Sequence, residues 1–292
     1  MVAVTTTKRG SLIGCQYCQI WLAGSDGLMY GDAGEGAANG TVTHALLLRN
    51  PVSAQVPNPA RIVTNLKGGN RWLGQYQFGI DTVGNFPLVI EDVDADMFAL
   101  ASDSDVDDTT NTRWNQFTDN KNNGNLPQMG IALSTPFQSR DDGSDGVNLW
   151  INYFIPKCQI DVNFPQMGYQ AEGQVTCQVS PTMATKKPTG EDFTAMRAKG
   201  GRVLMYVIVA PKPLALTMQI GAATPVTTIQ LAYKPTSTVV GASNAANQLT
   251  IDGTITALSS VVTSTGVATK SSAGTTADKN VVLYETDFEA AA

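Results

Sequence analysis

Apolar and polar residues alternate over much of Val147–Val179, and this pattern constrains the fold more than any other feature of the chain. A period of two is typical of β-strands that bury one face. In a first predicted strand the apolar positions are Val147, Leu149, Ile151, Tyr153 and Ile155. In the next two strands they are Cys158, Ile160, Val162 and Phe164, and then Ala171, Gly173, Val175, Cys177 and Val179. The chain is therefore predicted to form sheets with two different faces.

The opposite face of the last two strands is polar and carries few charges. Its residues are Gln159, Asp161, Asn163, Gln170, Glu172, Gln174, Thr176 and Gln178. Pro165–Gly168 is a turn signal, so the two strands are predicted to form a hairpin. A turn centred between Met167 and Gly168 pairs Phe164 with Ala171, Val162 with Gly173, Ile160 with Val175 and Cys158 with Cys177. Registers shifted by two residues keep the same faces, so they stay open.

The fold is predicted to be mainly β, with sheets that form a sandwich or barrel and one short flanking α-helix. Charged residues make up 15% of the chain, which disfavours long amphipathic helices. The helix is predicted over Thr189–Ala198, because Thr189 can cap its start and two glycines follow its end. Arg202–Ala210 is apolar almost throughout and is predicted to be a strand covered on both sides.

The order of predicted elements suggests three parts. Residues 1–10 are an N-terminal arm, residues 11–213 the main β domain, and residues 214–292 a C-terminal β segment or small appended domain. Leu12–Leu22 is the first strand of the main domain, and Trp72–Phe78 is a strand with an inward aromatic face. Residues 81–146 are predicted to be a long loop with a short helix near Asp92–Ala101.

The charge balance argues against a tight nucleic-acid binder. The chain has 19 basic and 25 acidic residues, a formal charge of −6, so it lacks the usual basic surface that binds phosphate. No segment is apolar for long enough to be a secretory signal or a membrane span. A protein that is made and kept in the cytosol, without membrane contact, is expected.

No metal site or cofactor is expected. Cys15 and Cys18 have the spacing of half a zinc site, but no second such pair follows and His44 is the single histidine. On a continuous strand the two thiols would lie on opposite faces. The four cysteines are therefore expected to be buried thiols.

An acidic stretch imitates the start of a calcium loop without completing it. Asp103, Asp105 and Asp107 have the right spacing, but Asp108 and Trp114 stand where a glycine and a bidentate glutamate are required. A hydrated acidic loop is the favoured interpretation, and weak cation binding within an assembly stays open.

The chain is predicted not to be an enzyme. A single histidine leaves no convincing triad, and no phosphate-binding glycine motif occurs in a strand–turn–helix context. The neighbouring acids Glu91 and Asp92, and Asp141 and Asp142, lie in predicted loops and are better explained as solvated residues.

The order of elements resembles that of the major tail tube proteins of long-tailed bacteriophages. The resemblance covers about Gly10–Pro211 and is one of pattern, without a diagnostic motif. It consists of an arm, the strand SLIGCQYCQIW (Ser11–Trp21), a long loop, the two-faced strands, the helix, and the strand RVLMYVIVA (Arg202–Ala210).

The resemblance implies a structural virion protein that delivers the phage genome. Its β-sandwich subunits would form hexameric rings that stack through arms and long loops into a tail tube. Its partners would be further copies and the tip and terminator proteins of the tail, and DNA would pass without sequence-specific binding. The protein would be made in the host cytoplasm and end in the virion tail. The implied lumen residues are Gln159, Asp161, Asn163, Glu172, Gln174, Thr176 and Gln178.

Two other classes stay open. A capsid decoration or fibre protein would share the β-rich composition. A carbohydrate-binding β module would need an exposed aromatic platform, for which Trp114, Trp150 and Phe154 are candidates. Burial of these rings in a core or a subunit interface is the competing explanation.

Overall fold

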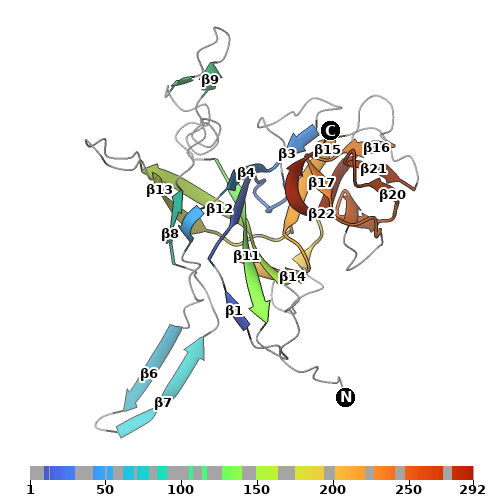
Figure 1. Cartoon of the computed structure of the whole chain (residues 1–292). Coiled ribbons are helices and arrows are strands. Elements are labelled where there is room, and N and C mark those ends of the chain that lie inside the picture. The colour runs from blue at the N-terminus through green and yellow to red at the C-terminus, as the bar shows by residue number, and fades with distance from the viewer. Residues whose placement is uncertain are drawn as a thin grey trace, which may run out of the picture.

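The structure is a computed structural model of the 292-residue chain. It describes residues 10–12, 14–29, 42–49, 51–54, 62–68, 71–78, 84–90, 105–107, 114–116, 127–139, 149–163, 175–193, 201–220, 227–240, 247–271 and 278–291. The described residues form a mainly β fold, as predicted (Figure 1).

The largest sheet has nine strands in the order β4-β2-β11-β12-β13-β8-β5, with β1 beside β11 and β14 beside β12. The strands are β1 (Gly10–Leu12), β2 (Tyr17–Leu22), β4 (Leu46–Arg49), β5 (Pro51–Ala54), β8 (Phe86–Ile90), β11 (Met129–Ser139), β12 (Leu149–Asn163), β13 (Val175–Pro181) and β14 (Tyr206–Ala210). All their pairings are antiparallel.

This sheet curls around its own core. Strands β4 and β5 stand at opposite ends of its strand order, yet residue 50 alone separates them along the chain. The two ends of the sheet therefore lie within about 7 Å of each other. The enclosed core takes side chains from β2, β4, β8, β11, β12 and β13. It includes Ile20, Leu88, Ile131, Ile160 and Val179, each no more than 1% exposed.

Strand β12 runs through Pro156, where the sequence pattern predicted two separate strands. Its pairing with β11 shifts by one residue between Met129 and Ile131, which leaves one extra residue on β12 between Ile155 and Cys158. Such a bulge accommodates a proline and reverses which face the following residues occupy. Ile155 and Cys158 therefore both face the enclosed core.

Strands β12 and β13 form the predicted hairpin in a different register. Ile160 pairs with Val179 and Val162 with Cys177, whereas the predicted partners were Val175 and Gly173. The shift is four residues, an even number, so both faces are as predicted. The predicted turn at Met167 and Gly168 lies outside the described residues.

The C-terminal strands form two further sheets. One has the order β19-β18-β22-β15-β3 with β17 beside β22, and the other has the order β16-β21-β20. The strands are β3 (Val42–His44), β15 (Leu214–Ile220), β16 (Thr228–Gln230), β17 (Tyr233–Pro235), β18 (Asn247–Ile251), β19 (Thr254–Thr256), β20 (Leu258–Val262), β21 (Val267–Lys270) and β22 (Lys279–Ala290). A second core, which includes Ile229, Leu249, Ala268, Val282 and Tyr284, takes residues from both sheets.

Two buried amide side chains join the curled sheet to the C-terminal strands. Gln19 of β2 donates from Nε2 to the Leu214 carbonyl and accepts from the Leu216 amide at 3.4 Å. Asn152 of β12 accepts at Oδ1 from the Leu214 amide at 3.2 Å and from Ser134 Oγ at 2.7 Å. Strand β3 pairs only with residues 217–219 of β15. The Gln19 and Asn152 side chains therefore hydrogen-bond to the part of the β15 edge that β3 does not reach. We call this arrangement the amide seam.

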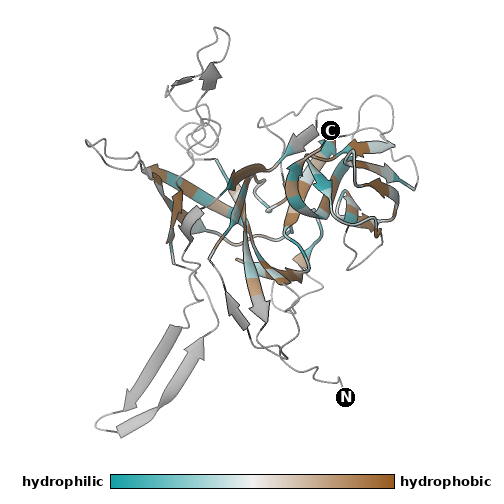
Figure 2. Ribbon diagram, viewed as in Figure 1, coloured by the Kyte–Doolittle hydropathy of each residue, from teal (hydrophilic) through white to brown (hydrophobic). Residues whose placement is uncertain are grey.

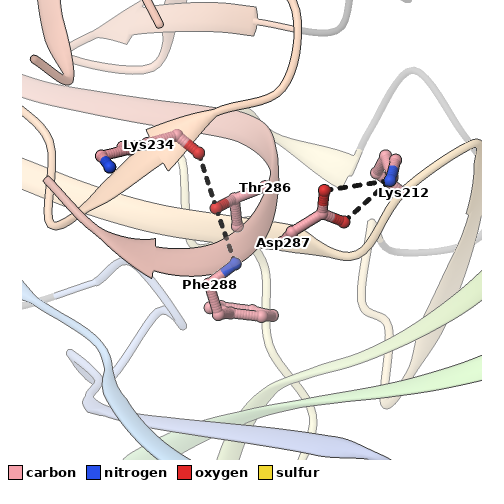
Figure 3. Close-up of polar contacts among 5 residues, drawn as sticks. All are labelled: Lys212, Lys234, Thr286, Asp287 and Phe288. Carbon is pink, nitrogen blue, oxygen red and sulfur yellow. Dashed lines mark hydrogen bonds and ion pairs between the residues drawn. The ribbon is translucent and has the colours of Figure 1, made fainter. Parts of the chain in front are cut away.

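A bulge in β22 makes a second contact with the curled sheet. The pairing of β17 with β22 shifts between Tyr233 and Pro235, and Phe288 has a φ of 59°. Thr286 Oγ1 donates to the Lys234 carbonyl at 2.8 Å and accepts from the Phe288 amide at 2.9 Å (Figure 3). The Phe288 ring packs on Tyr17 at 4.6 Å between ring centroids, and its carbonyl accepts from Arg49 at 2.7 Å.

An ion pair lies beside this bulge. Lys212 Nζ contacts both carboxylate oxygens of Asp287 at 2.9 and 3.0 Å (Figure 3). Both side chains are largely exposed, at 41% and 50%, so the pair contributes little to stability.

Several predicted elements are corrected. Residues 81–146 are not one long loop, because they contain β8 and the central strand β11, together with the short pair β9 (Asp105–Asp107) and β10 (Trp114–Gln116). Leu12–Leu22 is not continuous, since residues 14–16 separate β1 from β2. The start of the predicted helix, Thr189–Phe193, is a turn followed by a bridge between Asp192 and Lys186. The remainder of that helix and the predicted helix at 92–101 lie outside the described residues.

Other predictions are tested in part. The strand predicted at Trp72–Phe78 is present as β7 (Arg71–Phe78), which pairs with β6 (Ile62–Gly68). The side chains of β7, and the arm at residues 1–9, lie outside what the structure describes. The separation of residues 214–292 as a domain stays a prediction, although β15 begins at Leu214 and its sheet includes β3 from residues 42–44.

The amide seam makes Asn152 a residue on which stability depends. Asn152→Ala is expected to lower the free energy of unfolding by about 2 to 4 kcal/mol, because the buried Leu214 amide and Ser134 hydroxyl lose their acceptor. Urea denaturation followed by circular dichroism measures the change. Gln178→Ala, an amide on the partly exposed face of β13, is the control and is expected to change stability by less than about 0.5 kcal/mol. Equal effects of the two substitutions would contradict the structural role of the seam.

Candidate functional site

The polar face of β12, β13 and β8, whose described side chains are at least partly exposed, is the candidate site. Gln159 and Asp161 of β12 lie on it, and in β13 so do Thr176 and Gln178. Asp161 pairs with Gln178 across the two strands, and Thr176 pairs with Asn163. Asp161 is exposed, and the other three side chains that the structure describes here are partly exposed.

Of the seven predicted lumen residues, these four have described side chains, and the structure brings them together on one face. For Asn163 it describes the backbone alone, and Glu172 and Gln174 lie outside the described residues. Three residues that the sequence analysis did not include also belong to this face: Pro87 and Val89 of β8, and Ser180 of β13. The alternation in Phe86–Ile90 could have identified β8, but five residues inside an acidic stretch are a weak signal.

The two faces of these strands differ sharply in polarity. On β13, Val175, Cys177 and Val179 are fully buried in the curled-sheet core, while Thr176 and Gln178 between them are not. Figure 2 shows the resulting alternation of hydrophobic and hydrophilic bands along the strands. Because a one-residue slip would exchange the faces, this burial pattern fixes the orientation of the polar face.

Positive charge on the described part of the polar face is confined to its margin. Lys157 of β12 lies at the bulge, and its Nζ donates to the Ser25 carbonyl at 2.9 Å. The nearest described charge further along β12 is Asp161, which is negative. The face therefore offers amide and hydroxyl groups to a ligand or to water, without an array of cations for phosphate.

Strand β14 presents an apolar patch on the other face of the sheet, the face that carries the enclosed core. Arg202–Ala210 was predicted to be covered on both sides, but β14 begins at Tyr206, and Val207 and Val209 are 46% and 58% exposed. They pair with Tyr153 and Ile151 of β12, both partly exposed. Within the described residues β14 pairs with β12 alone, and no described strand pairs with its other edge. We call these four side chains and this edge the β14 patch.

The opposite side of β14 explains why half of the predicted strand is covered. Tyr206 stacks on Phe154 at 5.1 Å between ring centroids and meets Phe193 edge-on at 5.6 Å. Ile208 and Ala210 pack in the same cluster, against the start of β15. Covering this face requires the C-terminal strands, which the apolar pattern of β14 alone does not reveal.

The aromatic candidates for a carbohydrate platform are engaged within the fold. Phe154 is 1% exposed, and partly buried Trp150 lies 5.6 Å from Tyr17 between ring centroids. The Trp114 side chain lies outside the described residues.

The four cysteines are free thiols gathered around one core. Cys18, Cys158 and Cys177 are buried in the curled-sheet core, and partly buried Cys15 packs against it. Cys15 precedes β2, so the prediction that it lies opposite Cys18 on one strand is wrong. No group of three or more metal-binding side chains is present in the described ranges.

Burial makes these thiols poor nucleophiles. It raises the pKa of Cys15 to about 11 and that of Cys177 to about 12, and it also raises the pKa of Cys18 and Cys158. At Cys15, hydrogen bonding with the backbone of Tyr17 and Ser134 offsets part of this rise in pKa. The thiols are therefore structural in the folded chain.

Comparison with known proteins adds no family. No family model matches the chain, and no curated protein matches it. In the part of the chain that the structure describes, no helix has the length and apolar character needed to cross a membrane. The polar face and the β14 patch are therefore the features from which a function is inferred.

The thiol environment predicts slow reaction with thiol reagents. With its pKa raised from 9.0 to about 11, even Cys15 should react about 100-fold more slowly in the folded chain than in urea at pH 8. The folded state binds thiol protons more tightly, so its stability is complete below about pH 9 and falls as the pH rises further. Absorbance with Ellman's reagent measures the first effect, and urea denaturation at several pH values measures the second. Rapid reaction of a native thiol would contradict the structure.

Proposed function

We propose that this chain is a structural subunit of a phage-type tail tube, which assembles as stacked hexameric rings through which a genome passes. The polar face of β8, β12 and β13 would line the lumen, and the role would be non-catalytic and without a cofactor. The observation that carries the proposal is the combination, among the described residues of one subunit, of an at least partly exposed polar face and an apolar strand edge without a partner strand.

The chemistry of the polar face suits a surface past which DNA slides. Each phosphate contact with lysine or arginine adds salt-dependent affinity, so a basic wall would hold DNA. Gln159, Thr176 and Gln178 hydrate the surface without that attraction, and Asp161 repels phosphate weakly. A face of this kind allows passage and needs no binding site for a base or a phosphate.

The β14 patch supports association with a second copy of the chain. A strand edge without a described partner strand and with neighbouring exposed valines favours pairing with another strand. In a ring, this patch would meet a different surface of the next subunit, because head-to-tail contacts close into rings. Each ring would then extend the curled sheet of one subunit into that of its neighbour.

The proposed partners follow from this role. They are further copies of the chain, and the tip and terminator proteins that begin and end a tail. The finished protein would reside in the virion tail after synthesis in the host cytoplasm.

Negative-stain electron microscopy of the concentrated protein tests the proposal. Stacked rings or hollow tubes are expected, with growth that depends on protein concentration. Monodisperse monomers or compact trimers under all conditions would contradict the proposal and favour a decoration protein or a binding module.

A charge placed in the β14 patch should prevent assembly. Val209→Glu is expected to leave the subunit folded but abolish rings and tubes, because it adds a carboxylate to an apolar contact surface. The control is Val239→Glu, which changes a valine that is 60% exposed outside the patch. Sedimentation velocity compares the two variants, and circular dichroism checks their folding. Normal tubes from folded Val209→Glu would exclude the patch from the subunit contact.

A further inference from the structure

A lysine and an asparagine meet inside the core of the C-terminal strands. Lys270 of β21 is 6% exposed and Asn280 of β22 is 0% exposed. Lys270 Nζ donates to Asn280 Oδ1 at 2.8 Å. The amine therefore lies in direct contact with the Asn280 side-chain amide, the group whose carbon it would have to attack.

Both side chains enter the core from facing sheets. Lys270 shares a face of β21 with buried Ala268, and Asn280 shares a face of β22 with buried Val282 and Tyr284. Strands β21 and β22 belong to different sheets. A covalent bond between the two side chains would join these sheets through the core that they share.

The Asn280 amide is held in one orientation. Its Nδ2 donates to the Gln219 carbonyl at 3.1 Å and to the Asp278 carbonyl at 3.0 Å. These bonds direct the nitrogen away from Lys270 and leave the carbonyl oxygen facing the amine. Held in this way, the carbonyl carbon is presented to the amine on each encounter.

The surroundings of Lys270 favour its neutral form and supply a carboxyl group. Burial lowers the pKa of Lys270, and the charges of Asp278 and Asp252 oppose that effect. Asp278 is 8% exposed and is two residues from Asn280. A lower pKa makes the neutral, nucleophilic form of a lysine more accessible, and a nearby carboxyl group can carry protons.

We propose that Lys270 and Asn280 form an amide cross-link inside the folded chain, with Asp278 as the proton carrier. The neutral amine adds to Asn280 Cγ, a bond from Nζ to Cγ forms, and the bond from Cγ to Nδ2 breaks. One amine proton passes through the Asp278 carboxyl group to the departing nitrogen, which leaves as ammonia. The carboxyl group ends as it began, so no oxidant, metal or cofactor takes part.

The cross-link would join two sheets of the chain by a covalent bond, whether the chain is a tube subunit or another β protein. It does not depend on the proposed function. The four cysteines cannot supply such a tie, because they are free thiols in another core. An amide resists reducing agents and heat, and it limits how far the two sheets can separate under force.

Mass spectrometry of the purified full-length chain tests the cross-link. The folded chain is expected to weigh about 17 Da less than its sequence, the mass of one ammonia. In an unmodified chain, trypsin cleaves after Lys270 and Lys279 and releases residues 280–292 as a free peptide. In the cross-linked chain, cleavage after Lys270 is blocked and residues 280–292 stay joined to the peptide that contains Lys270.

Three variants separate the chemistry from the fold. Lys270→Arg keeps a cation but cannot form the amide, so it should retain the full mass, and Asp278→Ala should do so or react much more slowly. Lys234→Arg changes a lysine elsewhere in the C-terminal strands and should still lose about 17 Da. Circular dichroism checks that each variant is folded.

A folded wild-type chain of full mass, with a free 280–292 peptide after prolonged incubation, would overturn the proposal. Loss of ammonia at the normal rate in folded Asp278→Ala would overturn the role of Asp278.

Discussion

The hydrogen bonds of Gln19 and Asn152 to the edge of β15 hold the two halves of the described structure together. The curled sheet can enclose its own core, but its outer face at β2, β11 and β12 is apolar around Trp21, Ala132 and Phe154 and needs a cover. Strand β15 provides that cover. Its edge extends beyond the end of β3, so the backbone groups near Leu214 need hydrogen-bond partners other than β3. Amide side chains have the donors and acceptors of a peptide group, so they can complete this edge without another strand.

The amide seam also determines which part of the outer face of the curled sheet the C-terminal strands cover. The C-terminal strands cover the outer face near β2 and β14, where Phe288 packs on Tyr17 and the Leu214 amide donates to Asn152. Beyond the bulge at Pro156, the outer face of β12 and β13 has no cover among the described residues. The polar face is therefore the part of the outer face that lies beyond the seam, whereas the exposed side of β14 lies on the opposite face of the sheet, with Tyr153.

The sequence predicted the faces of the strands better than their partners. Alternation identified the buried and polar sides of β12 and β13 because a period of two depends on local geometry alone. It could not choose between registers that differ by an even number, and a proline hid the continuity of β12. Gln19 and Asn152 could not be recognised as buried from the sequence. An amide in an alternating strand looks like a surface residue until its hydrogen-bond partner is known, and here the partners lie far along the chain in β15. For the same reason the pattern of β14 did not reveal that one side is covered and the other exposed.

The central claim is that the polar face lines an enclosed lumen, and cysteine labelling of assembled tubes tests it most directly. The native thiols are shielded, so Gln178→Cys introduces a reactive thiol on the polar face, and Ser264→Cys introduces one on an exposed turn of the C-terminal strands. In tubes, a small maleimide should label both variants, whereas a polyethylene-glycol maleimide too large to enter the lumen should label Ser264→Cys and spare Gln178→Cys. Equal labelling of both variants by the large reagent would contradict the claim and place the polar face on the outside.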